Sequence, residues 1–128
     1  MPRLVGALAV LCATFVVAGC GTVGIPDASA DKSLGKQLFT QKCGSCHTLA
    51  DAGTSGKIGP NLDNAFERSR TDGLGEATVR QVVRGQIAYS VVDPSTGSTG
   101  MPRDLVKGAD ADAVAAYVAS VAGVSAAK

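Results

Sequence analysis

The sequence is short of the residues that most folded domains use to build and brace a core. Its 128 residues include no tryptophan, three phenylalanines, two tyrosines and a single histidine. Small domains bury a limited share of their surface and often depend on a metal, a cofactor or disulfides for stability. The length gives room for one small domain, and a large apolar cofactor at its centre would supply what this core lacks.

An excess of charge of either sign is also lacking. Twelve basic side chains stand against eleven acidic ones, which gives a formal net charge of +1. Domains that bind nucleic acid normally carry a basic patch or stripe, so this balance predicts no nucleic-acid partner. The net charge also gives no indication of long-range steering toward a strongly charged partner.

The first nineteen residues, 1–19, have the pattern of an export signal. Arg3 is their one charged side chain, and an uncharged stretch follows from Leu4 to Gly19. This stretch is shorter than the ~20 apolar residues that a transmembrane helix needs, so it favours a signal peptide. An uncleaved membrane anchor and a plain secretory signal cleaved nearby are the alternatives, and all three predict export of the domain.

The end of this segment, the sequence VAGC at residues 17–20, resembles the lipobox of bacterial lipoproteins. The resemblance implies that Cys20 carries diacylglycerol and becomes the first residue of the mature chain. Residues 20–30 would then be a lipidated N-terminus and tether. We therefore expect the domain to be exported and held by lipid at the outer face of a bacterial cytoplasmic membrane, or to lie in the periplasm.

Two cysteines remain, Cys43 and Cys46, in the sequence CGSCH at residues 43–47. This C-x-x-C-H pattern is the attachment sequence of c-type heme. Two thiols three residues apart near a helix end can reach the two vinyl groups on one edge of a porphyrin and form thioethers. The next imidazole then points at the iron. The pattern predicts one covalently bound heme c, attached to Cys43 and Cys46, with His47 as an iron ligand.

Other uses of a cysteine pair fit less well. A disulfide is a common expectation for an exported pair, but the histidine that follows it favours heme. A thioredoxin-like redox pair needs a βαβ context, and the segment before Cys43 has a helical pattern instead. A structural zinc site needs four ligands, and the chain offers one histidine and no further cysteine. Chance occurrence of so short a pattern remains an alternative.

A second iron ligand follows by elimination. His47 is the only histidine, and Met101 is the one methionine that the mature chain would contain. His and Met together ligate iron in electron-transfer cytochromes, where the thioether raises the reduction potential. Methionine more often fills a gap in a core, but this one lies among Gly, Ser, Thr and Pro. We interpret Met101 as the opposite axial ligand, with a lysine at no preferred position as the other candidate.

Apolar spacing predicts helices separated by long loops. Four segments have this spacing: residues 31–43, 62–67, 71–84 or 75–84, and 110–121. Asp31 or Ser33 can cap the first helix, and Gly85 favours a stop for the third. Asp110 can cap the last helix, and Gly123 lies just past its apolar stripe. The long loop at residues 88–103 delivers Met101.

Together these features resemble a small class I cytochrome c over about residues 31–123. The residues that carry the resemblance are Gly35, Phe39, the run 43–47, the sequence GPNL at 59–62, Met101 with Pro102, and Tyr117. The resemblance implies an all-α cytochrome c fold, in which three to five helices and long connecting loops surround one covalently bound heme. The domain would cover residues 31–128.

The resemblance also implies particular contacts. The first and last helices of this family cross closely, which would place Gly35 at the contact and Phe39 near Tyr117. The family's proline after the heme sequence corresponds to Pro60, whose carbonyl would accept a hydrogen bond from the His47 ring and fix its orientation.

The chain departs from many relatives in two places. They carry a tryptophan beside a heme propionate, and this chain has none. Arg80, Arg84 and Tyr89 are the candidate substitutes, and an exposed surface role is the alternative for each. The segment between Gly85 and Met101 is also long for a compact relative.

An iron with both axial positions filled has no free site for a small-molecule substrate, so the ligand pair predicts a single-electron carrier rather than an enzyme. The resemblance implies a bacterial respiratory chain, with a quinol-oxidising cytochrome complex as donor and a terminal oxidase as acceptor. A lipid tether would hold the domain near both partners. The alternatives are a heme subunit of a larger exported dehydrogenase, and a heme sensor or peroxidase-like enzyme in which Met101 dissociates.

Overall fold

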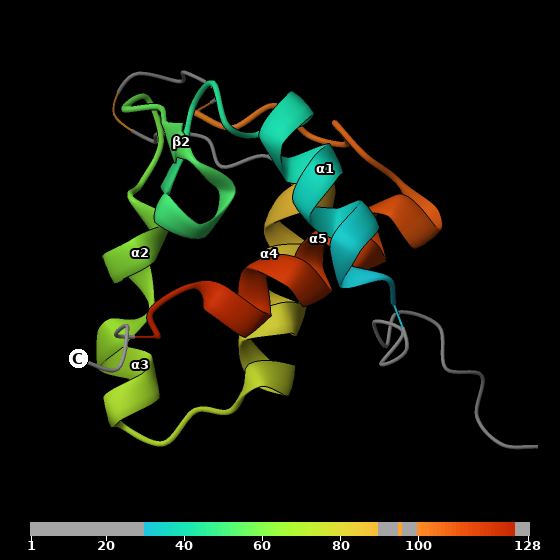
Figure 1. The fold of residues 1–128 in the computed structure, drawn as a ribbon. Helices are drawn as coiled ribbons and strands as arrows, with labels where there is room; N and C mark the ends of the chain where they lie inside the picture. The colour runs from blue at the N-terminus through green and yellow to red at the C-terminus, as the bar shows by residue number, and fades with distance from the viewer. Residues whose placement is uncertain (1–29, 90–94, 96–99, 125–128) are drawn as a thin grey trace, which may run out of the picture.

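The computed structural model describes residues 30–89, 95 and 100–124, and Figure 1 shows their course. The predicted signal segment, Cys20 and the tether up to residue 29 lie outside these described residues. The elements in chain order are α1 (Lys32–Lys42), β1 (Thr48–Leu49), the 3-10 turn η1 (Ala50–Ala52), β2 (Thr54–Ser55), α2 (Leu62–Ala65), α3 (Glu67–Thr71), α4 (Glu76–Ala88) and α5 (Gly108–Val121). Helices dominate, which confirms the all-α class. None of the helices in the described part is long and apolar enough to cross a bilayer.

Helix α1 begins where the sequence predicts. The Asp31 carboxylate accepts hydrogen bonds from the backbone N–H groups of Ser33, at 2.8 Å, and Leu34, at 3.1 Å. These bonds satisfy donors that have no partner within the helix. Asp31 is therefore the cap, and the alternative cap Ser33 lies inside the first turn.

Helices α1 and α5 cross closely, as the family resemblance implies. A Cβ atom on Gly35 would collide with the backbone of Ala113, so only glycine allows this approach. Next to this contact the rings of Phe39 and Tyr117 pack edge to face, with centroids 6.0 Å apart. Both predicted contacts are confirmed, and the crossing fixes the end of α1 that leads into the cysteine pair.

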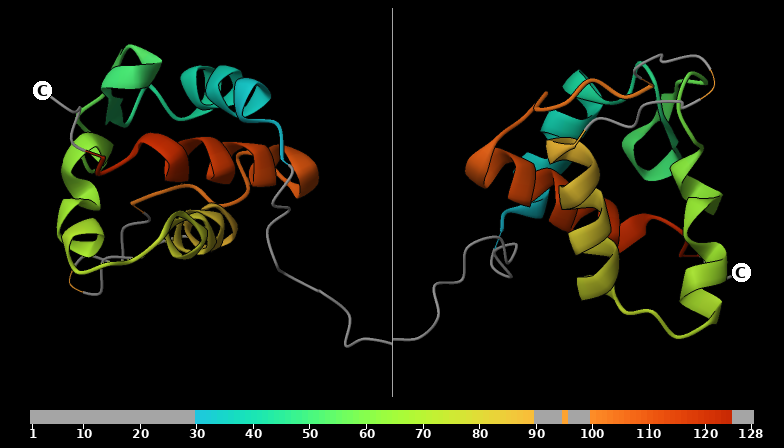
Figure 2. Two further views of the ribbon diagram at one scale, coloured as in Figure 1. Left: turned by 60° about the horizontal axis from the view of Figure 1, so that its bottom comes forward. Right: turned by 180° about the vertical axis from the view of Figure 1, so that it is seen from behind.

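Helix α5 lies between α1 and α4 (Figure 2). Its small side chains let it be buried around most of its circumference: Ala111, Ala113, Val114, Ala115, Ala116, Tyr117, Val118 and Ala119 are all buried. The helix begins at Gly108, so the prediction that Asp110 caps it was wrong. Asp110 lies in the first turn, where a carboxylate still favours the positive end of the helix dipole.

Helix α4 is longer than its sequence pattern predicts. It starts at Glu76 and continues through Gly85 to Ala88, so the predicted stop at Gly85 was wrong. Ile87, beyond that glycine, is buried in the core. Burying this side chain is worth about 1.5–3 kcal/mol, which exceeds the cost of about 1 kcal/mol for glycine inside a helix.

The connection between α1 and α2, for which the sequence predicts no regular element, contains a small hairpin. Strands β1 and β2 are antiparallel, with Thr48 opposite Ser55 and Leu49 opposite Thr54. The predicted short helix at residues 62–67 is two helices, α2 and α3, separated at Phe66. In Figure 1 the hairpin and these two helices flank one end of α5, which places the chain after the cysteine pair near the core.

Candidate functional site

The described residues surround one apolar cavity of about 370 Å³. This volume is in the range of pockets that hold a drug-sized ligand. Its lining comes from the end of α1, the segment before α2, helices α2, α4 and α5, and the Met101 segment: Phe39, Lys42, Cys43, Cys46, His47, Ile58, Gly59, Pro60, Leu62, Ala65, Phe66, Val83, Gln86, Ile87, Gly100, Met101, Pro102, Leu105, Val114 and Val118. All four residues predicted to hold the heme and its iron therefore line one cavity.

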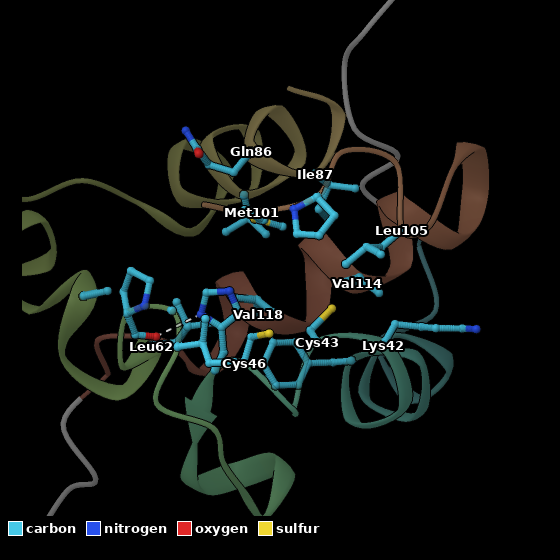
Figure 3. Close-up of a pocket in the computed structure, with 18 of the residues that line it drawn as sticks. Lys42, Cys43, Cys46, Leu62, Gln86, Ile87, Met101, Leu105, Val114 and Val118 are labelled. Carbon is cyan, nitrogen blue, oxygen red and sulfur yellow. Dashed lines mark hydrogen bonds between the residues drawn. The ribbon is translucent and has the colours of Figure 1, made fainter. Parts of the chain in front are cut away.

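The two cysteines lie along one side of the cavity with their sulfur atoms toward it, and Met101 lies across from them (Figure 3). Cys43 ends α1, and the backbone N–H groups of Cys46 and His47 both donate to its carbonyl oxygen at 3.0 Å. The chain therefore turns tightly after α1, which brings both thiols and the imidazole to the same wall.

Both cysteines are free thiols rather than a disulfide. Cys43 is 7% exposed. Burial, and secondarily the neighbouring Cys46, raises the pKa of the Cys43 thiol to about 11. The thiol is therefore protonated at neutral pH, whereas binding a metal as a ligand requires the thiolate.

The imidazole of His47 is held from two sides. Its Nδ1 donates a hydrogen bond to the Pro60 carbonyl oxygen at 2.9 Å, which is the contact that the family resemblance implies. Because a carbonyl only accepts, Nδ1 carries the proton and Nε2 keeps its lone pair for a metal. A Cβ atom on Gly59 would lie 2.5 Å from Cε1 of the ring, so glycine is required beside it.

Met101 is half-buried and faces the cavity from the opposite wall. The segment that carries it is fastened to α4, because the backbone N–H of Asp104 donates to the Ile87 carbonyl oxygen at 2.8 Å. Val106 then enters the core. These contacts hold Met101 at the cavity without a regular element at Met101 itself.

The three candidates for a heme propionate do not line this cavity. The guanidinium of Arg84 pairs with Asp112 of α5 at 2.6 Å, and that of Arg80 lies 3.5 Å from a carboxylate oxygen of Glu76. Tyr89 is 72% exposed. A role for any of the three at a heme propionate therefore stays a prediction. Apart from His47, the cavity-lining side chains with N–H donors are those of Lys42 and Gln86.

No sequence pattern pointed to Asp63, which fastens the hairpin to the helices. Its carboxylate accepts from the backbone N–H of Ala50, at 2.9 and 3.2 Å, and its carbonyl oxygen accepts from that of Gly123 at 3.2 Å. The hairpin at the His47 side is thus tied to α2 and to the end of α5.

A second network of polar side chains joins α5, the η1 turn and α1. The Tyr117 hydroxyl donates to Asp51 at 2.6 Å, and the Lys36 ammonium lies 3.1 Å from the same oxygen. The Tyr117 hydrogen bond, followed by Lys36, holds the pKa of Asp51 below its ordinary value. Burial, followed by Asp51, raises the pKa of Tyr117.

The residues of the cavity fit a heme better than a bare ion. Among the described residues no group of three or more His, Cys, Asp or Glu side chains is placed to hold a metal. One imidazole and one thioether leave most positions of an iron ion without a ligand, and a porphyrin supplies four nitrogens. Its apolar faces match the lining, and two thiols at one wall match the attachment chemistry.

Comparisons with known proteins agree with this geometry. Residues 33–122 match the family described as Cytochrome c. A stretch of 45 residues is 40% identical to a cytochrome c of Ulva intestinalis, covering 35% of this chain and 40% of that protein. The chain thus spans less than half the length of this relative. No solved structure matches significantly. Since the family match covers most of the chain, the protein belongs to the cytochrome c family, whose members bind covalently attached heme c and transfer electrons.

Proposed function

We propose that this protein is a single-electron carrier, with one heme joined by thioethers to Cys43 and Cys46 and ligated by His47 and Met101. One observation supports the proposal above all others. These four side chains, from segments up to 58 residues apart, meet at one apolar cavity. The family membership independently supports the heme.

Each part of the cavity has a role in this proposal. The heme iron supplies a one-electron couple. The Pro60 carbonyl orients the His47 ring and makes it a better donor, and the thioether of Met101 favours the ferrous state. The apolar lining excludes water, which disfavours the additional charge of the ferric state and so raises the potential. If His47 and Met101 both hold the iron, they would leave it no free site for a substrate, so the proposed activity is electron transfer alone.

The proposed setting is a bacterial respiratory chain outside the cytoplasm. The export signal at residues 1–19 and the lipid on Cys20 would hold the domain at the outer face of the cytoplasmic membrane, or leave it in the periplasm. A quinol-oxidising cytochrome complex is the proposed donor and a terminal oxidase the proposed acceptor. Residues 20–30 would let the domain reach both at high effective concentration.

The ligand assignment is tested on the purified, heme-loaded full chain. The ferric protein should show the near-infrared band of methionine sulfur on iron, and Met101→Ala should lose this band. Leu105→Ala is the control, because Leu105 lies four residues further along the same segment and also lines the cavity. It should keep the band. A band that survives in Met101→Ala would show that another side chain ligates the iron.

The anchor is tested separately. Mass spectrometry of the mature N-terminus should find lipid on Cys20, and Cys20→Ala should release the protein from membranes while leaving its heme spectrum unchanged. Unmodified Cys20 in the membrane-bound protein would contradict the lipid assignment and leave the electron-carrier proposal intact.

A further inference from the structure

Thr54 of the hairpin contacts both halves of the heme-attachment sequence. Its hydroxyl oxygen lies 2.9 Å from the carbonyl oxygen of His47 and accepts from the backbone N–H of Leu49 at 3.1 Å. Its methyl carbon packs on Gly44, where a Cβ atom would lie only 2.5 Å away. The contact is part-buried, so water competes with it less than at an exposed site.

The rest of the hairpin segment also closes on residues 43–47. The backbone N–H of Gly59 donates to the Cys46 carbonyl oxygen at 2.8 Å. A Cβ atom on Gly56 would lie 2.6 Å from the backbone of Ser45 and Cys46. The attachment sequence therefore packs between α1 and this segment. A shift of the hairpin would move the attachment sequence as well.

His47 is fixed at two ends by different residues of this segment. The Pro60 carbonyl and Gly59 hold the ring. The Thr54 side chain holds the other end of His47, because its hydroxyl donates a hydrogen bond to the main-chain carbonyl of His47. A ring held only at its tip can rotate with its backbone, so the orientation of the imidazole plane depends on both ends.

We propose that Thr54 is a positioning residue for the axial imidazole: its hydroxyl holds the His47 main chain and so sets the orientation of the ring over the heme. This inference rests on the proposed ligation of iron by His47. The hydroxyl carries the role, and the methyl group only packs against Gly44.

Thr48 offers a matched control within the same hairpin. It has the same side chain and is also half-buried, and its hydroxyl donates to the carbonyl oxygen of Gly56 at 2.8 Å rather than to His47. Replacing either threonine by valine removes a hydroxyl that bonds to a backbone carbonyl, and Thr54→Val also removes the contacts of that hydroxyl with the N–H and carbonyl oxygen of Leu49. A general loosening of the hairpin should appear in the melting temperatures of both variants, so the comparison depends on the heme resonances rather than on stability.

The test uses the heme-loaded protein with Thr54→Val, Thr54→Ser and Thr48→Val. The readout is the set of heme methyl resonances in proton NMR spectra of the ferric protein, because their spread reports the orientation of the axial ligands. Thr54→Val should lose the wild-type pattern and shift the midpoint potential by more than Thr48→Val does. Thr54→Ser keeps the hydroxyl and should retain the wild-type pattern and potential.

Two results would overturn the inference. One is a wild-type pattern of heme methyl resonances in Thr54→Val, even if its melting temperature falls. The other is a changed pattern in Thr54→Ser, which decides the question even if the valine variant does not fold. Failure of the proposed function looks different, because the wild-type protein itself would then lack the spectrum of a low-spin heme with a histidine ligand.

Discussion

The two sides of α5 are built in different ways. Toward α1, the chain fills the space itself: Gly35 lets the two backbones meet, and Phe39 packs on Tyr117. Toward Met101, the elements surround an apolar cavity of about 370 Å³. The chain alone therefore specifies the helix crossing, whereas on the other side the proposed heme would complete the core. The comparison predicts that changes on the two sides have separable effects on stability and on the heme.

The largest effect is expected from removal of the attachment sites. The double variant Cys43→Ala/Cys46→Ala cannot form thioethers. It should therefore lose the heme and leave the cavity empty. At about 24 cal/mol per Å³, an uncollapsed cavity of 370 Å³ corresponds to roughly 9 kcal/mol, comparable to the whole stability of a small domain. Thermal unfolding followed by circular dichroism should therefore show loss of cooperative folding.

Ser45→Ala, within the same attachment sequence, is the control for this experiment and should retain the heme. If the double cysteine variant unfolded cooperatively at the wild-type temperature, the cavity side would not depend on the heme and the comparison would fail.

The next largest effect is expected at the helix crossing. Gly35→Ala places a methyl group against the Ala113 backbone and should cost about 3 kcal/mol in the free energy of unfolding. Gly85→Ala is the control, because the added Cβ in α4 would meet no atom within 4 Å beyond the neighbouring residues and backbone of its own helix. It should stabilise the protein by up to about 1 kcal/mol.

Denaturant titration of the heme-loaded protein measures both glycine variants. Equal free energies of unfolding in the two would show that α1 and α5 do not meet closely at Gly35.

A smaller effect is expected from Tyr117→Phe, which removes the hydrogen bond to Asp51. The loss should be about 1 kcal/mol near pH 7, since Asp51 stays part exposed and keeps Lys36. The pKa of Asp51 is lowered in the folded protein from an ordinary value of 3.8. Its contribution is therefore present above about pH 4 and is lost as the pH falls through the folded pKa.

The free energies of unfolding of wild type and Tyr117→Phe should accordingly converge as the solution is acidified below pH 4. The near-infrared band of the ferric heme should stay unchanged, because neither Tyr117 nor Asp51 lines the cavity. A difference in stability that persisted undiminished in acid would exclude the Asp51 carboxylate as its source.

The sequence predicts the parts of this molecule that depend on local signals. Asp31 marks the start of α1 because a cap needs only its own helix. Residues 43–47 predict the wall of the cavity proposed to hold the heme, because thioether attachment requires the C-x-x-C-H spacing. Gly85 gives a wrong prediction for the end of α4, because burial of Ile87 outweighs the local preference of glycine for a helix end. The contacts of Asp63 and Thr54 join separate segments, and no pattern along the chain marks them.

The most direct test of the account is the state of the two thiols in the purified, exported protein. Proteolysis followed by mass spectrometry should recover the peptide that contains residues 43–47 with one heme attached and with neither cysteine open to alkylation. A colourless protein in which Cys43 and Cys46 both alkylate, or are joined to each other, would contradict the account at its centre.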